Sequence, residues 1–397
     1  MNNIRVRVKV NRSYKLLLVC NLLFNLLFNM SLLLDCFANQ TKPTTDVKTT
    51  SDQVVNLENR ESNSKSKSKS NSKEGKIQIV ISVDWEGEDL KDANLKAFNN
   101  FREKYPQIKI QHFLNPVYFL RAEELALSEE EVNKKIRSVI REGDEEGLHL
   151  HAWRHIVEKS KVKFKDEFCN PVYPNFFDFF NSSKDGLFVP IWVYTKEELI
   201  KIIATSKEIL MKQKFKEPKS FRAGGWMATS DVLYALAESG IKIDCSSIPS
   251  CYSLSGWDEG YLKKWVNQIW ASIKPTEQPF IVGEGHQQII ELPNNGHLSD
   301  YVSAKQMLES FKNMVDELKK NPSKDIYLSL GFHQESAAEY LINLQEAIEL
   351  IKEWALQNNV PYEFATFPLK GLIDAQTSKT LPSKQIIKAD EMNMFPQ

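Results

Sequence analysis

The sequence predicts a single α/β domain in which parallel strands form a barrel and helices cover it. Two observations support this prediction. From Lys76 onward, about seven or eight strand-like segments alternate with helical segments over roughly 300 residues. In addition, ionisable side chains fall at the carboxyl ends of several of these strands, which is where barrels of this kind place their chemistry.

The first half of the barrel is read from two strand patterns and a helix. Residues 77–83 have isoleucine or valine at every second position, which indicates a strand. A weaker strand is expected at 108–113. A Ser-x-x-Glu capping box opens an amphipathic helix over 128–140. The next strand contains the histidine-rich segment 147–155.

The second half continues the alternation. A Thr-x-x-Glu capping box opens a helix over 195–210, and a strand follows at 220–224. The helix over 230–240 ends at a glycine, which suits the left-handed position after a helix. The remaining expected elements are strands at 241–246, 289–292, 326–332 and 362–367, with helices at 303–320 and 337–357.

The ends of the chain differ in composition from the barrel. Residues 1–38 are typical of a signal peptide or an N-terminal membrane anchor, because basic residues precede a long apolar run. Residues 39–75 are rich in serine and lysine and predict a disordered linker. We therefore expect an exported protein, in the periplasm, in the cell envelope or outside the cell, with the barrel at 76–375 and a C-terminal tail at 376–397.

Charge and cysteine content exclude two classes of protein. Basic and acidic residues nearly balance, at 51 and 52, and no basic stripe lies outside the linker, so nucleic acid is not an expected partner. Two of the five cysteines lie in residues 1–38. The odd number that remains argues against a disulfide framework. We expect Cys245 and Cys251 to be buried thiols, with a disulfide between them as the alternative.

Three of the seven histidines lie within 149–155. In a strand, His149 and His151 point to the same face. In a helix or turn, His151 and His155 become the neighbours. Either pair could bind one metal ion, and a catalytic zinc site usually has three protein ligands. The sequence therefore predicts a metal site and leaves open which two histidines form it.

Four further residues lie at the ends of the expected strands. Asp84 and Glu86 share one face of the first strand, where one carboxylate could bind a metal and the other could act as a base. Arg222 lies beside glycines and could hold a carboxylate through paired hydrogen bonds. His333 follows the strand at 326–332 and is a candidate general acid.

Together these motifs resemble the polysaccharide deacetylases of the NodB-homology type, carbohydrate esterase family 4. The resemblance covers Ile77 to Leu369 and depends on the order and spacing of four motifs. These motifs are Val83-Asp84-Trp85-Glu86-Gly87, His151 to His155, Phe221 to Trp226, and Leu328 to His333. It implies a distorted (β/α) barrel that forms a single catalytic domain and binds a divalent metal, usually zinc, through one acidic side chain and two histidines.

The resemblance also assigns roles to residues. Asp84 matches the catalytic base, Glu86 takes the place of the acidic metal ligand, and His333 matches the acid. Because Trp85 stands where the family has a second aspartate, the roles of the two carboxylates could be exchanged.

The second motif can be aligned in two ways. The spacing selects His151 and His155, whereas the preceding Glu145-Glu146-Gly147-Leu148 favours His149 as the first ligand. The third motif, at Arg222, lacks the proline and the aromatic residue that the family usually has there, so substrate recognition could differ.

The implied function is removal of N-acetyl or O-acetyl groups from a polysaccharide or other glycan by a metal-dependent hydrolase. Two alternatives stay open. One is a hydrolase of non-peptide C–N bonds on a small molecule or a lipid-linked sugar. The other is a secreted glycan-binding protein without catalysis. The sequence does not specify the glycan, the metal or the oligomeric state.

Overall fold

The computed structural model describes residues 74–166, 185–249, 261–365, 367 and 369–393. The predicted signal peptide or anchor and nearly all of the predicted linker lie outside these ranges, as does Cys251. Within the described ranges, no helix has both the length and the apolar character needed to cross a membrane.

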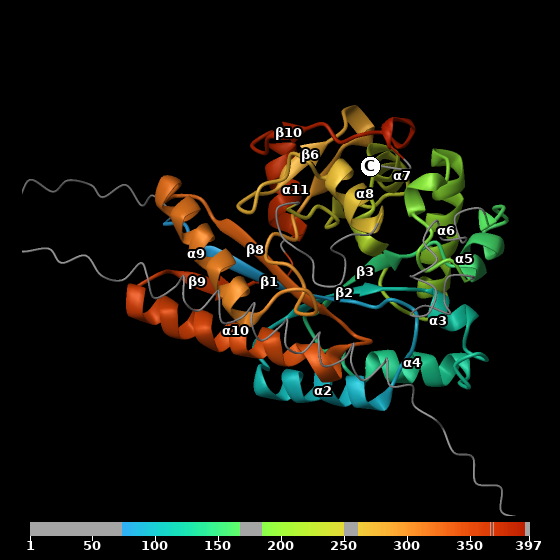
Figure 1. The fold of residues 1–397 in the computed structure, drawn as a ribbon, viewed down its shortest axis with the longest axis horizontal. Coiled ribbons are helices and arrows are strands. Elements are labelled where there is room, and N and C mark those ends of the chain that lie inside the picture. Colours follow the sequence, from blue (N-terminus) through green and yellow to red (C-terminus); the bar gives the residue numbers. More distant parts are fainter. Residues whose placement is uncertain (1–73, 167–184, 250–260, 366, 368, 394–397) are drawn as a thin grey trace, which may run out of the picture. The chain divides into compact units, whose positions relative to one another are not determined.

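A curled, mostly parallel sheet forms the centre of the fold, and helices lie on its outside (Figure 1). The strand order is β10-β6-β7-β5-β4-β3-β2-β1-β8. Strand β9 pairs with the first residues of β1, and β2 pairs with the last residues of β1. Only β6 and β7 pair in antiparallel fashion among the described strands. The strands are β1 (Ile77–Asp84), β2 (Ile110–Leu114), β3 (Glu145–Leu150), β4 (Ser220–Ala223), β5 (Ile243–Asp244), β6 (Phe280–Val282), β7 (Ile289–Glu291), β8 (Ile326–His333), β9 (Tyr362–Phe364) and β10 (Ser383–Lys384).

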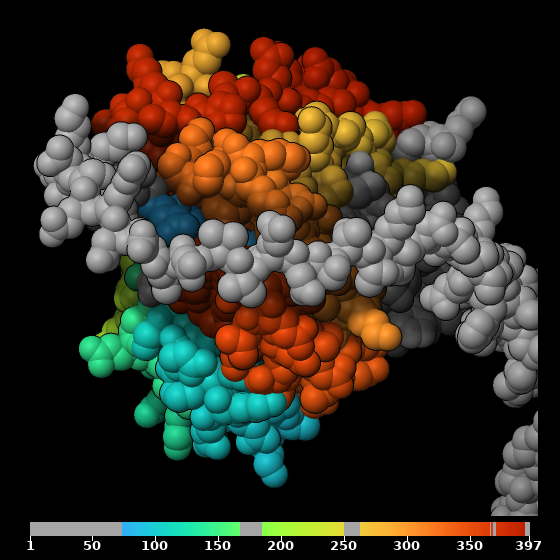
Figure 2. All heavy atoms as spheres, turned by 90° about the vertical axis from the view of Figure 1, so that its left-hand side faces the viewer, coloured from blue at the N-terminus to red at the C-terminus, as the bar shows by residue number. Residues whose placement is uncertain are grey.

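The helices follow the strands as the sequence predicts, and the capping boxes expected at Ser128 and Thr195 are both formed. Helices α2, α10 and α9 lie side by side on one face of the folded part (Figure 2). The α-helices are α2 (Asp92–Lys104), α3 (Val117–Leu120), α4 (Glu129–Arg137), α5 (Arg154–Lys159), α6 (Lys196–Lys212), α7 (Ser230–Glu238), α8 (Tyr261–Ile269), α9 (Ala304–Lys320), α10 (Ala337–Asn358) and α11 (Leu369–Thr377).

The segment after β7 joins the two sides of the curled sheet. The backbone N–H of Asn294 donates to the carbonyl of Ser247, which follows β5, while the N–H of Gly296 donates to Ser329 in β8. The side chain of Asn295 also bonds to the backbone of β8, accepting from the N–H of Ser329 and donating to the carbonyl of Tyr327. The sheet is thereby closed by a short irregular segment, and the predicted distorted barrel is confirmed.

Two apolar clusters fill the two sides of the sheet. The large one lies between the strands and the outer helices and includes Ile77, Ile79, Ile81 and Val83 of β1. The smaller one lies on the opposite face of β1 and includes Val80, together with side chains of β2, β5 and β7. Because successive strand residues point to opposite faces, the polar ends of the strands are carried on the same face as Val80.

The structure adds elements that the sequence patterns did not indicate, among them α2, α8, β6 and β10. We expected residues 376–397 to be a tail, which the structure contradicts for the residues up to 393. Strand β10 pairs with β6, and the side chains of Ile386 and Met392 are buried. This stretch belongs to the folded unit because its few apolar residues cover the edge of the sheet.

Candidate active site

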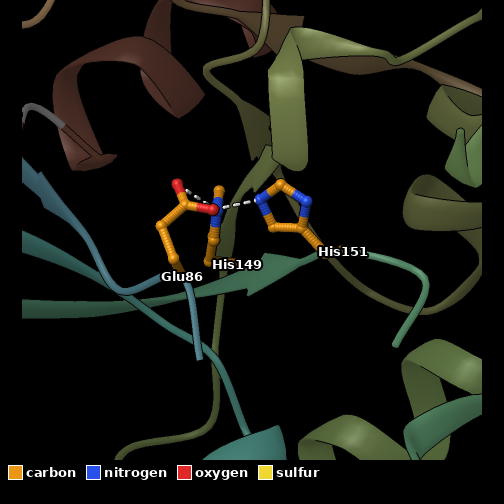
Figure 3. A group of neighbouring side chains, drawn as sticks. All are labelled: Glu86, His149 and His151. Atoms are coloured by element: carbon orange, nitrogen blue, oxygen red, sulfur yellow. Dashed lines mark ion pairs between the residues drawn. The ribbon is translucent and has the colours of Figure 1, made fainter. Parts of the chain in front are cut away.

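Glu86, His149 and His151 come together where β1 and β3 end. The Nε2 atom of His149 lies 3.4 Å from Oε1 of Glu86, and Nε2 of His151 forms an ion pair with Oε2 of the same carboxylate. Figure 3 shows both rings directed at the carboxylate. Both histidines are more than nine-tenths buried. The possible ligand atoms of the three residues lie within 4.8 Å of one another.

The other nitrogen of each ring is held by the backbone. Nδ1 of His149 lies 2.9 Å from the carbonyl oxygen of Arg222, and Nδ1 of His151 lies 2.7 Å from that of Leu187. A carbonyl oxygen only accepts, so Nδ1 must carry a proton in both rings. In the neutral imidazole, the lone pair is then on Nε2, which has no hydrogen-bond partner among the described residues besides Glu86. This is the arrangement of metal-binding histidines.

The charge of Glu86 suits the same role. Burial alone would raise the pKa of Glu86, but the facing rings of His151 and His149 hold this pKa well below its usual range. Burial would likewise lower the pKa of His151, and the negative charge of Glu86 raises it instead. One carboxylate and two imidazoles form a ligand set that fits zinc or a similar divalent ion.

A glycine admits the ring of His151 to this position. A Cβ atom added to Gly224 would lie 2.4 Å from Cε1 of His151, which is closer than any real contact. The backbone after β4 therefore packs directly against the ring. The glycines of the third motif make room for a proposed metal ligand.

His155 lies apart from this group. Its Nε2 atom pairs with Oε1 of Glu124 at 2.7 Å, and its side chain is about one quarter exposed. The reason is local: β3 ends at Leu150, and α5 begins only at Arg154. His151 and His155 are therefore not on one helix, and the structure groups His149, in β3, with His151, the residue directly after β3, instead.

Asp84 and Arg222 form a buried ion pair beside Glu86. Nη1 of Arg222 donates to Oδ1 of Asp84 at 2.8 Å and to Oγ of Ser82 at 2.9 Å. The Nε atom of Arg222 donates to the carbonyl of Cys245, and the guanidinium lies over the ring of Phe113. Among the described residues, no side chain donates a hydrogen bond to the second carboxylate oxygen of Asp84. That oxygen is free to accept a proton.

His333 completes the group and has a partner that the sequence patterns did not indicate. Nδ1 of His333 lies 2.7 Å from Oδ2 of Asp300, and Nε2 lies 3.1 Å from Oε1 of Glu86. Burial would lower the pKa of His333, but the charge of Asp300 raises it well above the ordinary value. The pKa shift therefore favours the protonated form of His333. Asp300 follows the segment that closes the barrel, and this segment has no regular strand pattern by which it could have been found.

These residues line a cavity of about 340 Å³. Aromatic rings of Phe188, Trp226 and Tyr301 form part of its wall, and Glu88 and Glu335 add carboxylates. Among the described residues, no lysine or arginine lines it. Trp226 is buried and also lines the cavity. Trp226 adopts a left-handed backbone conformation with φ of 57°, which is unusual for a large side chain and typical of functional sites.

Comparison with known proteins gives distant structural similarities. No family model matches the chain, and no curated protein matches it. A solved structure described as a polysaccharide deacetylase from Mycobacterium smegmatis is similar at a TM-score of 0.46 and 11% identity, over 80% of this chain and 95% of that chain. A glycoside hydrolase/deacetylase from Parabacteroides distasonis has a TM-score of 0.45 and 10% identity, over 77% and 72%. A 4-alpha-glucanotransferase from Thermococcus litoralis has a TM-score of 0.42 and 13% identity, over 78% of this chain and 41% of that chain.

Proposed function

We propose that this protein is a metal-dependent hydrolase that removes acetyl groups from an acetylated glycan, with zinc as the first candidate metal. The observation that carries the proposal is the ligand set of Glu86, His149 and His151. Beside it lie one carboxylate with a free oxygen, Asp84, and one histidine whose pKa is raised by Asp300, His333. A hydrolase of this kind needs these three parts together.

A divalent ion bound there would polarise the acetyl carbonyl as a Lewis acid. Asp84 accepts the proton of the attacking water through its free oxygen, while Arg222 holds the carboxylate in place through Oδ1. His333 donates a proton from Nε2 to the leaving amine or hydroxyl group, because Asp300 fixes its Nδ1 side. The two proton-transfer groups are thus oriented independently.

The cavity supports an uncharged acetylated sugar as substrate. Its walls combine aromatic rings with carboxyl groups and, apart from the proposed acid His333, carry no described cationic side chain, so they offer little attraction to a negatively charged substrate. Sugars pack their C–H faces against aromatic rings through apolar contact.

We further propose that residues 1–38 direct export or form a membrane tether. The test is to express the full chain in a cell and to measure the mass of the protein that is recovered.

The first test is the metal content of the full chain, measured by mass spectrometry. The variants His149→Ala, His151→Ala and His155→Ala are compared with it. We expect about one equivalent of zinc, lost in the first two variants and kept in the third, which serves as the matched control. Two equivalents would point to a second ion at Asp84, Glu86 and His333, whose possible ligand atoms also lie within 4.8 Å of one another.

The second test is activity on a panel of acetylated substrates. Release of acetate from N-acetylated chitooligosaccharide, from O-acetylated xylan and from a small N-acetylated amine separates the glycan deacetylase from the other hydrolases. A protein that binds no metal after loading with zinc, cobalt or nickel, and releases no acetate, would contradict the proposed function.

A further inference from the structure

We propose that Trp153 and Glu335 are positioning residues that hold the backbone of Glu86 where its side chain can bind the metal. This inference rests on the proposed function. It concerns residues that lie outside the ligand set and that bond to the carbonyl and the N–H of the peptide unit between Glu86 and Gly87.

Glu86 needs such support because it lies beyond the end of a strand. Strand β1 ends at Asp84, and the backbone N–H of Trp85 makes the last bond to β2, donating to the carbonyl of Phe113 at 3.1 Å. The side chain of Trp85 is fully buried and points away from the site, where its indole N–H donates to His112. The chain thus places its acidic ligand one residue after this tryptophan, where no strand pairing fixes the main chain.

Trp153 supplies the first support. Its indole N–H donates to the carbonyl of Glu86 at 2.9 Å, and Nδ2 of Asn115 donates to the same oxygen at 2.9 Å. The guanidinium of Arg121 lies over the Trp153 ring at 4.3 Å, and its Nη1 donates to the carbonyl of Gly87. Trp153 follows His151 by two residues, so one short segment carries two proposed ligands and a support for the third.

Glu335 supplies the second support from the segment after β8, which pairs with β1 on the side away from β2 and β3. Its Oε1 accepts from the backbone N–H of Gly87 at 3.0 Å and of Glu88 at 3.4 Å. The hydroxyl of Tyr118 donates to the same oxygen. Glu335 follows His333 by two residues, so the loop that presents the proposed acid also fixes the backbone next to the proposed ligand.

The turn itself leaves little freedom. Gly87 has φ of 90°, and a Cβ atom there would lie 2.2 Å from Cγ1 of Val117. The carbonyls of Glu86 and Gly87 and the N–H groups of Gly87 and Glu88 are all bonded to side chains. The main chain from Glu86 to Glu88 can therefore shift only if these contacts break. Outer residues that orient a ligand typically contribute about 10- to 100-fold to metal affinity.

The test measures the zinc affinity of the full chain by competition with a chelator, and the absorption spectrum of the cobalt-loaded protein. Trp153→Phe keeps an aromatic ring beside Arg121 and removes the indole N–H together with part of the indole ring, as Trp192→Phe does at the control site. We expect it to weaken zinc binding about 10-fold or more and to shift the cobalt bands. Glu335→Ala should weaken binding similarly, whereas Glu335→Gln keeps an acceptor oxygen and should restore most of the affinity.

Trp192→Phe is the matched control, because Trp192 is buried and does not line the cavity. It should leave zinc affinity and the cobalt spectrum unchanged. The inference is overturned if Trp153→Phe and Glu335→Ala lower the melting temperature but bind zinc as the wild type does, or if Trp192→Phe weakens binding equally. If the wild type itself binds no metal, the proposed function fails first. If the wild type binds and the variants bind equally, only the positioning role fails.

Discussion

The barrel holds two buried aspartate–arginine pairs that differ in how completely the aspartate is bonded. Asp144 and Arg102 form the first pair, with Nη2 of Arg102 2.9 Å from both carboxylate oxygens. Asp144 also accepts from the backbone N–H groups of Ile110 and Arg141 and lies 3.3 Å from Nε2 of His112. Asp84, in the second pair, accepts from the side chain of Arg222 and from no other side chain in the part of the chain that the structure describes.

The difference separates a structural carboxylate, Asp144, from the proposed base, Asp84. Asp144 has every acceptor position occupied and does not line the cavity. Its partner His112 is kept neutral because burial lowers its pKa, which fits Nδ1 accepting from Trp85 while Nε2–H donates to Asp144. Asp84 is equally buried, yet one oxygen is unbonded and the residue lines the cavity. The number of unfilled acceptor positions therefore distinguishes the two pairs better than burial does.

The largest expected effect is the loss of catalysis on changing the reactive carboxylate. Asp84→Asn should lower kcat by about two to four orders of magnitude, because the amide cannot accept the proton of water, and His333→Ala should do the same through loss of the acid. Metal content should remain near that of the wild type in both variants. A variant that keeps full activity would remove its residue from the mechanism.

Changing the structural carboxylate should affect stability instead. Asp144→Asn leaves Arg102 buried without its counter-charge and should lower the free energy of unfolding by about 3–5 kcal/mol in urea titrations. Asp84→Asn should cost less, since Arg222 keeps its bonds to Ser82 and Cys245. The rate per folded molecule should not change in Asp144→Asn. Equal destabilisation by the two variants would remove the distinction.

This stabilisation should depend on pH. Burial would raise the pKa of Asp144, but the hydrogen bonds of His112, Ile110 and Arg141 hold it below the ordinary value. A depressed pKa contributes stability above the pKa of the unfolded chain, near 4, and this contribution is lost as the pH falls through the folded value. The difference in unfolding free energy between wild type and Asp144→Asn should therefore shrink below about pH 4. A constant difference down to pH 2 would contradict this account.

Changing Asp300 tests the proposed acid, His333, rather than the proposed base, Asp84. Asp300→Asn removes the charge that raises the pKa of His333 against the effect of burial. His333 must be protonated to act, so activity falls as the pH rises through its pKa, and the alkaline limb of kcat/KM should move to lower pH in this variant. Ser336→Ala is the control, because the Ser336 hydroxyl bonds to the same carboxylate without contributing charge. An alkaline limb that stays in place would exclude His333 as its origin.

The smallest effect is expected at an exposed pair. His155 and Glu124 are both partly exposed, so His155→Ala should change the free energy of unfolding by less than about 1 kcal/mol. Its unfolding midpoint can be compared directly with that of His151→Ala. A larger loss of unfolding free energy would show that the His155–Glu124 pair stabilises the fold more than an exposed ion pair normally does.

Much of this arrangement could be predicted from sequence, because it depends on local patterns. Alternating apolar residues gave β1, capping boxes gave the starts of α4 and α6, and polar residues after strands marked Asp84, Glu86 and His333. The choice among the three histidines could not be made, because it depends on whether a helix begins before or after His151, and such a boundary is uncertain by a few residues. Asp300 was missed because an irregular segment carries it.

Two other elements were missed for different reasons: the packing of α2 is not apolar throughout, and β10 is very short. Helix α2 buries Asn94 and Arg102 together with its aromatic residues, so its apolar stripe is interrupted. Asn94 is needed there because its Oδ1 accepts from the N–H of Ala338 at the start of α10. Strand β10 has two residues only, which is too short for any period to show.

The pairing of β1 with β8 has a consequence for how the protein is made. Ser82 and Leu330, which are hydrogen-bonded across these strands, are separated by 248 positions in the chain. Contacts between such distant positions form late, since a long loop must close before any of them is gained. During translation, Glu86, His149 and His151 leave the ribosome long before His333 and Asp300. We therefore expect the growing chain to be inactive until β8 is complete, so that the proposed hydrolysis would begin only with a finished molecule.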